Sequence, residues 1–284
     1  MIVSRRKGKP SLRSATPTWR KPGSSLGCFA LVDMGSRAAR LFPKPRNYRA
    51  GMFKFAGTLD SPKPRRVDLL RTLIHGLPGS AMPSFRRLSS AELNALVDYI
   101  RLLSVRGEVE SLLVEEWLYA DVPPQEAVEE FYELVWERWN EAEESGVTVI
   151  APAPISTSAR LALGREAFLD ADRGNCFSCH GTQGKGDGPS ATRMDESGQT
   201  FALLKDDWGQ FVLPRDFAAG VFRGGDRRED IFLRMYCGIP GTPMPSIGLS
   251  RKADNSPLLS EEESWAVVDF VLSLSGKGPL AGLK

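Results

Sequence analysis

The sequence lacks any long apolar run. No stretch approaches the roughly 18 apolar residues that a membrane-spanning helix needs, so we predict no transmembrane segment in the visible chain. The first 25 residues are basic, but no apolar segment follows them, and no signal peptide is visible. Cys28 likewise has no apolar run upstream, so a lipoprotein anchor is not expected.

A large net charge is also absent, because the 284-residue chain carries only +2 overall. The charges are nevertheless unevenly distributed: residues 1–104 carry +15, residues 105–146 carry −11 and residues 147–284 carry −2. Opposite charges in neighbouring segments favour contact between them, although two separately solvated surfaces explain the pattern equally well. The basic residues are scattered among Pro and Gly without a recognisable binding motif, so nucleic acid is not a predicted partner.

Two copies of one sequence pattern are present in the chain. Residues 75–85 read HGLPGSAMPSF and residues 237–247 read CGIPGTPMPSI, which places Met82 and Met244 at matching positions 162 residues apart. Upstream, residues 43–53 resemble residues 213–222. Because internal repeats correspond to repeated structural units, we predict two related modules, a first module at residues 33–105 and a second module at residues 155–276.

Each module is predicted to end in a helix. Ser89 with Glu92, and Ser260 with Glu263, fit the capping box, in which the Ser oxygen accepts an early backbone N–H and the Glu reaches back. Between the modules lies an acidic segment, residues 106–154. Apolar residues at steps of three and four predict an amphipathic helix there, packed on one module, and an earlier short helix is plausible over residues 109–119. Its apolar face consists of Val128, Phe131, Val135, Trp139 and Ala142.

The scarcest residue types, with 4 Cys and 2 His in the whole chain, meet in one motif. Cys176, Cys179 and His180 form C-x-x-C-H. Two thiols at this spacing can add across the two vinyl groups of a protoporphyrin, and the adjacent imidazole then faces the iron. A thioredoxin-like redox site would require a βαβ context, and a structural zinc site would require four ligands; neither is apparent in the sequence.

The flanks of the motif carry a family resemblance. Gly164 and Phe168 lie on one face of a short helix before it, and the Gly-rich run at residues 184–189 lets backbone wrap closely over a flat ligand. With the CFSCHG attachment site, a loop bearing a Met and a C-terminal helix bearing aromatic residues, residues 155–276 resemble a class I c-type cytochrome. In that family the first and last helices cross near the Gly and an aromatic residue, which implies that Gly164 and Phe168 lie against Trp265 or Phe270.

This resemblance implies one covalent haem c, whose iron is held by His180 on one side and Met244 on the other. Prolines on either side of Met244 fix the backbone of its loop. Met235 is the nearest competing methionine, and ordinary core filling is the alternative role for a single Met. Two filled axial positions leave the iron no site for a substrate, so the expected function is electron transfer in a bacterial redox chain rather than catalysis. The implied partners are redox proteins, and the implied location is the periplasm or the outer face of the inner membrane.

The first module has no haem motif. Its only upstream cysteine is Cys28, and no His precedes His75, for which a surface or turn position is expected. Either this module is a degenerate cytochrome c-like domain that has lost its haem, or an unrelated or frame-shifted stretch replaces its true beginning. Residues 1–32 are basic and are expected to be disordered or non-native. Cys28 and Cys237 are expected to be free thiols, with a disulfide between them as the alternative.

We therefore predict a mainly α fold, with two cytochrome c-like helical domains in tandem, joined by the acidic helical segment and followed by a tail at residues 277–284. Two other functions stay open. A haem enzyme of the di-haem peroxidase type would require a labile axial site and a catalytic base, and no such base stands out. An interaction or sensor protein would use the first module and the acidic segment as docking surfaces.

Overall fold

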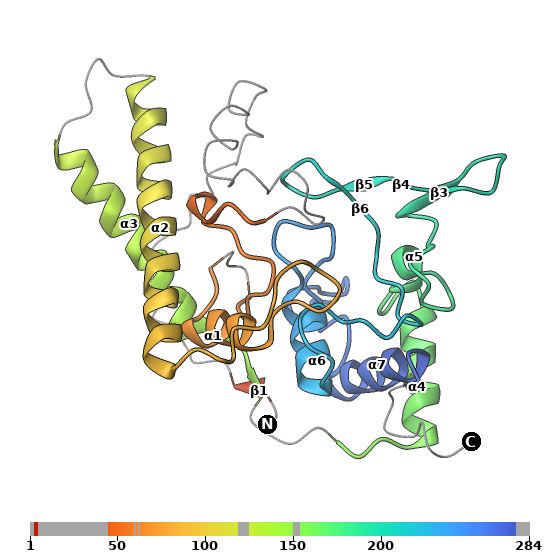
Figure 1. Ribbon diagram of the computed structural model, residues 1–284. Coiled ribbons are helices and arrows are strands. Elements are labelled where there is room, and N and C mark those ends of the chain that lie inside the picture. The colour runs from red at the N-terminus through yellow and green to blue at the C-terminus, as the bar shows by residue number, and fades with distance from the viewer. Residues whose placement is uncertain are drawn as a thin grey trace.

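The computed structural model describes residues 3–4, 45–59, 61, 63–118, 125–149 and 154–276 (Figure 1). These residues form seven α-helices and three two-stranded antiparallel sheets, so the fold is mainly helical. None of the helices in these ranges combines the length and the apolar character needed to cross a membrane. Apart from residues 3–4, the predictions made for residues 1–32, for Cys28 and for the tail at residues 277–284 lie outside the described residues.

The helices fall into two groups along the chain. The first contains the short helix η3 (Tyr48–Ala50), α1 (Arg66–His75), α2 (Ser90–Trp117) and α3 (Gln125–Ser145), and the second contains α4 (Ser158–Leu169), α5 (Phe177–His180), α6 (Arg228–Cys237) and α7 (Glu261–Leu274). The paired strands are β1 (Val3–Ser4) with β2 (Thr148–Val149), β3 (Thr192–Met194) with β4 (Thr200–Ala202), and β5 (Leu204–Lys205) with β6 (Phe211–Val212). Figure 1 shows α2 and α3 on one flank of the molecule, α4 and α7 on the other, and α1 and α6 between them.

A first hydrophobic core lies between α1, α2 and α3. Val135 and Trp139 of α3 are fully buried in it, and the ring of Trp139 meets that of Phe53 edge-on, with 5.7 Å between centroids. The helix predicted in the acidic segment is therefore present and packs by its apolar face on the first module, as expected. Val128 is the exception, because 42% of it is exposed.

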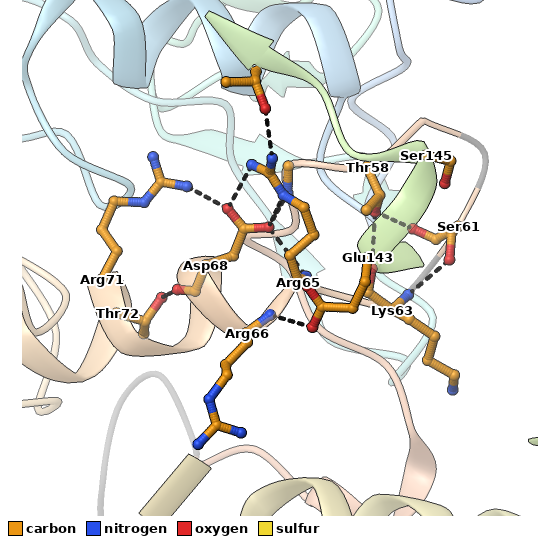
Figure 2. A network of polar contacts seen from close by, with 12 residues as sticks. Thr58, Ser61, Lys63, Arg65, Arg66, Asp68, Arg71, Thr72, Glu143 and Ser145 are labelled. Carbon is orange, nitrogen blue, oxygen red and sulfur yellow. Dashed lines mark hydrogen bonds and ion pairs between the residues drawn. The ribbon is translucent and has the colours of Figure 1, made fainter. Parts of the chain in front are cut away.

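Ion pairs join the basic first part of the chain to the acidic segment. Lys63 Nζ lies 2.5 Å from Glu108 Oε2, and both side chains are buried. Figure 2 shows a second junction, where the backbone N–H of Arg66 donates to Glu143 at 2.7 Å. The contact that the opposite charges favoured is thus made within one chain.

Helix α2 is longer than the sequence predicts. Its start is as expected, with Ser89 as N-cap and a complete capping box with Glu92. The separate helix considered over residues 109–119 is wrong, because α2 continues without a break through Trp117. No proline interrupts this stretch, and Gly107 is accommodated where Arg49 lies so close that an added Cβ would be 2.4 Å from its carbonyl oxygen. The boundary placed at residue 105 falls inside this continuous helix.

A second hydrophobic core lies between α4, α6 and α7. Helices α4 and α7 cross at Gly164, where a Cβ would lie 2.0 Å from the carbonyl oxygen of Ala266. Phe168 is buried beside this crossing and meets Phe270 edge-on at 5.3 Å between centroids. Of the two expected aromatic partners, Phe270 is confirmed, whereas Trp265 stacks on Phe232 of α6 at 4.4 Å.

A third, smaller core, which we call the junction cluster, lies between the modules. It consists of Leu59, Val147, Leu233 and Cys237, all buried. Two ion pairs also join the modules: Lys54 Nζ lies 2.9 Å from Asp206 Oδ2, and Arg71 Nη1 lies 3.2 Å from Asp230 Oδ1. The acidic segment therefore contributes to the interface between the modules through Val147.

The sequence repeat has a close counterpart in the backbone. Helices α1 and α6 each have ten residues and end at glycines of positive φ, Gly76 and Gly238. In the loop after α1, the N–H of Leu77 donates to the carbonyl oxygen of Met82 at 3.1 Å. In the loop after α6, Ile239 and Met244 make the same bond at 3.3 Å. The two methionine loops thus have the same local fold.

Candidate functional site

The C-x-x-C-H residues lie on one short turn of helix held against α4. Cys176 precedes α5, and its N–H donates to the carbonyl oxygen of Phe168 at 3.1 Å. The N–H groups of Gly174 and Asn175 donate to the end of α4 in the same way, at 3.0 Å and 2.9 Å. A buried helix therefore fixes the position and direction of the motif. Within the described residues 154–175, a helix and not a strand leads into it, which removes the thioredoxin-like interpretation.

The Gly-rich run after the motif pairs with the motif itself. The N–H groups of residues 186, 188 and 190 donate to the carbonyl oxygens of His180, Cys179 and Ser178, at 2.9 Å, 3.1 Å and 2.8 Å. These three bonds tie the loop to the turn that carries both thiols. The backbone around the motif is thus restrained from two sides.

The imidazole of His180 is oriented by a backbone carbonyl. Its Nδ1 lies 3.3 Å from the carbonyl oxygen of Arg215, so in the tautomer with Nδ1 protonated it donates there and Nε2 keeps a free lone pair. Burial lowers the pKa of His180, although this hydrogen bond opposes the shift. The ring of Phe217 stacks on the imidazole at 4.5 Å between centroids. A neutral, fixed imidazole of this kind is the form that ligates metal ions.

The two motif thiols are free and half-buried. Burial raises the pKa of the Cys176 thiol to about 12. No disulfide joins Cys176 to Cys179, so both sulfurs are in the reduced state that addition to a vinyl group requires. Cys237 is also a free thiol, as expected, but it is buried in the junction cluster.

Met244 lies in a loop that is held by hydrogen bonds between its own residues. Its N–H donates to Thr242 Oγ1 at 3.3 Å, and that hydroxyl donates to the carbonyl oxygen of Ile239 at 2.7 Å. The side chain of Met244 is half-buried and is not part of the second core. Met235, in contrast, is 6% exposed and packs inside that core. Of the two methionines, Met235 therefore fills space.

The family of this part of the chain follows from comparison with known proteins. A family model described as cytochrome c matches residues 161–275. Residues 161–275 form a cytochrome c domain. The match covers less than half of the chain and lies within the second module.

Comparison with solved structures extends the likeness beyond this domain. A chain of the reducing HAO-like protein complex of Kuenenia stuttgartiensis has 28% sequence identity and a TM-score of 0.59. The alignment covers 84% of this chain and 86% of that chain. The comparison with curated proteins gives no match.

Sequence reasoning missed a cluster at the edge of the cytochrome c domain, in which two cations of the first module lie on the ring of Trp208. The indole Nε1 of Trp208 is buried without a hydrogen-bond partner, and its ring packs on Gly241 in the loop of Met244. Arg46, from the first module, lies over this ring at 3.7 Å, and Lys54 lies 5.0 Å from it. Burial lowers the pKa of both Arg46 and Lys54. The repeat could have pointed to these two residues, because they match Arg215 and Arg223 of the second module.

The residues present fit the c-type haem that a cytochrome c domain implies. Cys176, Cys179 and His180 provide two reduced thiols and a neutral imidazole on one turn, and Met244 provides a thioether from a separate fixed loop. A buried indole N–H without a partner, beside desolvated cations, is the environment that a carboxylate-bearing ligand would complete. Within the described residues no group of three or more His, Cys, Asp or Glu side chains could hold a metal ion, so a zinc cluster of that kind is not formed there.

Proposed function

We propose that the chain binds one covalent haem c through Cys176 and Cys179, with His180 and Met244 as the axial ligands, and that it transfers electrons. The observation that carries this proposal is the imidazole of His180, which is held by the carbonyl oxygen of Arg215 at 3.3 Å beside two free thiols. When bound, the haem supplies a one-electron redox couple. A thioether ligand favours ferrous iron, and two filled axial positions exclude substrate from the metal.

The chain's own residues have three tasks in this function. Arg215 fixes the tautomer and the ring orientation of His180, and the prolines beside Met244 hold its loop in one conformation. Phe217 covers one face of the imidazole and excludes water from it. With a haem bound, these groups would hold the ring of His180 and the loop of Met244 in place, and the reorganisation that accompanies electron transfer would then be small.

The first test is the haem count. The full chain, expressed with an export signal and a c-type haem attachment system, is expected to give a pyridine haemochrome of one haem per chain. The colour should survive acid-acetone extraction, because thioether bonds hold the haem. Protein that is folded but colourless, or that loses its haem on extraction, would overturn the proposal.

The axial ligand has a test with a control inside the same chain. Met244→Ala is expected to convert the low-spin spectrum to a high-spin one that responds to carbon monoxide, because an axial position opens. Met82→Ala removes the matching methionine from the loop of the same fold in the first module and should leave the spectrum unchanged. A low-spin, unresponsive Met244→Ala protein would show that Met244 is not the ligand.

We further propose that the first module is a cytochrome c-like domain without a haem motif. Its support is the identical bonding of the two methionine loops, at Met82 and Met244, and the paired ten-residue helices before them. The likeness to a chain of a protein complex over 84% of this chain supports a redox protein as partner. Because c-type haem is attached outside the cytoplasm, we propose an extracytoplasmic location.

A further inference from the structure

A cleft of about 440 Å³ lies between the two modules. One wall comes from the first module, with Phe55 and the turn that follows α1. The other comes from residues 220–227 and α6 of the second module. None of the four proposed haem ligands lines it. Its volume falls in the range of small-molecule sites.

Arg234 of α6 lines this cleft, and its buried charge makes no ion pair with another described residue. It is only 9% exposed, and neither its Nε nor its Nη1 has a hydrogen-bond partner. Its guanidinium lies 5.7 Å from the ring of Phe55. Burial, and then the nearby charge of Arg71, lower the pKa of Arg234, and the charges of Asp68 and Asp230 oppose this shift only in part. A buried cation is costly unless an anion and hydrogen bonds compensate it.

Asp230, a carboxylate on the wall of the cleft, is already engaged by other arginines. Asp230 accepts hydrogen bonds from Arg227 Nε at 2.9 Å and from Arg71 Nη1 at 3.2 Å. Arg223, also on the cleft wall, donates only its Nη2, to the carbonyl oxygen of Gly79 at 3.4 Å, and its buried Nε has no partner. Four arginines thus line the cleft with two aspartates, Asp226 and Asp230. The cleft therefore contains more guanidinium groups, which donate hydrogen bonds, than carboxylate groups, which accept them.

We propose that this cleft binds an oxyanion, a carboxylate or phosphate group, which pairs with the guanidinium of Arg234. The fork of an arginine matches such groups with two parallel hydrogen bonds. Two sources can supply this chemistry. One is a free oxyanion from solution. The other, which rests on the proposed haem function, is a carboxylate of the haem itself: Phe222 lines the cleft and stacks on Phe217 at 6.0 Å, and Phe217 stacks on His180.

Thermal unfolding of the full haem-loaded chain tests the free anion. Inorganic phosphate, compared with chloride at equal ionic strength, is expected to raise the midpoint temperature of unfolding of the wild-type protein. Arg234→Met should weaken the apparent phosphate affinity at least tenfold while leaving the phosphate-free protein no less stable, because it removes an uncompensated charge and keeps the apolar stem. Arg87→Met makes the same change at an exposed position and should respond as the wild type does. Arg223→Met is the second variant should Arg234→Met fail to fold.

A measurement of the reduction potential distinguishes a haem carboxylate in the cleft from a free oxyanion. If it occupies the cleft, phosphate has no effect on the wild type, and Arg234→Met shifts the ferric-to-ferrous equilibrium about tenfold toward ferric haem, which is about 59 mV for one electron. Arg87→Met should leave the potential unchanged. A phosphate response that survives in Arg234→Met, or the absence of both effects, would overturn the anion site. The haem count would be untouched by either result, so the two proposals fail separately.

Discussion

Gly164 sets how closely α4 and α7 approach, because its missing side chain leaves room for the backbone of Ala266. Gly164→Ala is expected to destabilise the protein by about 1–3 kcal/mol, since the Cβ would lie 2.0 Å from a carbonyl oxygen and the helices must separate. Denaturant unfolding measures this loss. Arg165→Ala, one residue further on an exposed face, should change stability by less than about 0.5 kcal/mol. Equal stability of the two variants would refute the tight crossing.

At the residue scale, the sequence predicts the parts whose chemistry is local. Cys176, Cys179 and His180 follow from spacing alone, and Gly164 with Phe168 follows from the family resemblance. Trp208 and Arg234 could not be found in this way. Their meaning comes from burial without a partner and from contacts across more than 150 residues, neither of which leaves a spacing pattern.

Helix α1 depends on one buried carboxylate near its start. Asp68 accepts from the N–H of Gly57 at 2.9 Å. It also accepts from Arg65 Nε at 3.1 Å and from Arg71 Nη2 at 2.5 Å, and Figure 2 shows these two contacts. Burial alone would raise the pKa of Asp68, but the hydrogen bonds and charges of Arg65 and Arg71 hold it below its usual 3.8. The carboxylate therefore stabilises the fold above pH 4, and this contribution is lost as the pH falls through the lowered pKa.

Asp68→Asn is accordingly expected to cost roughly 3 kcal/mol at pH 7, because it leaves Arg65 without its charge partner and leaves Arg71 with Asp230 alone. The difference from wild type should shrink as the pH falls below about 4. Urea unfolding at a series of pH values checks both statements. Asp172→Asn, at an exposed position, serves as the control. A deficit that does not vary with pH would contradict the ionised role of Asp68.

At the scale of helices and strands, the sequence predicts where a helix starts better than how far it extends. The capping boxes at Ser89 and Ser260 are both formed. The unbroken course of α2 past residue 105 was not predicted, because its packing against η3 and α3 is what carries it through Gly107. The hairpins β3–β4 and β5–β6 were also missed, since their strands are only two or three residues long.

For the whole molecule, the junction cluster predicts cooperative unfolding of the two modules. Leu233 is 5% exposed between them, so Leu233→Ala should cost about 2–4 kcal/mol. The haem absorbance and the far-ultraviolet circular dichroism are expected to change in one coincident transition, in wild type and variant alike. Leu249→Ala, at a position that is 39% exposed, is the control. Two separate transitions would show that the modules unfold independently.

The junction cluster also has a kinetic consequence. Because Leu59 and Val147 pack directly on α6, the first module is not a tethered body that samples many positions. A redox protein that docks on any of its faces would hold its own centre at one fixed separation from the turn that carries His180. Tunnelling rates fall steeply with separation, so the choice of docking face, rather than the search of a mobile arm, would set how fast an electron crosses.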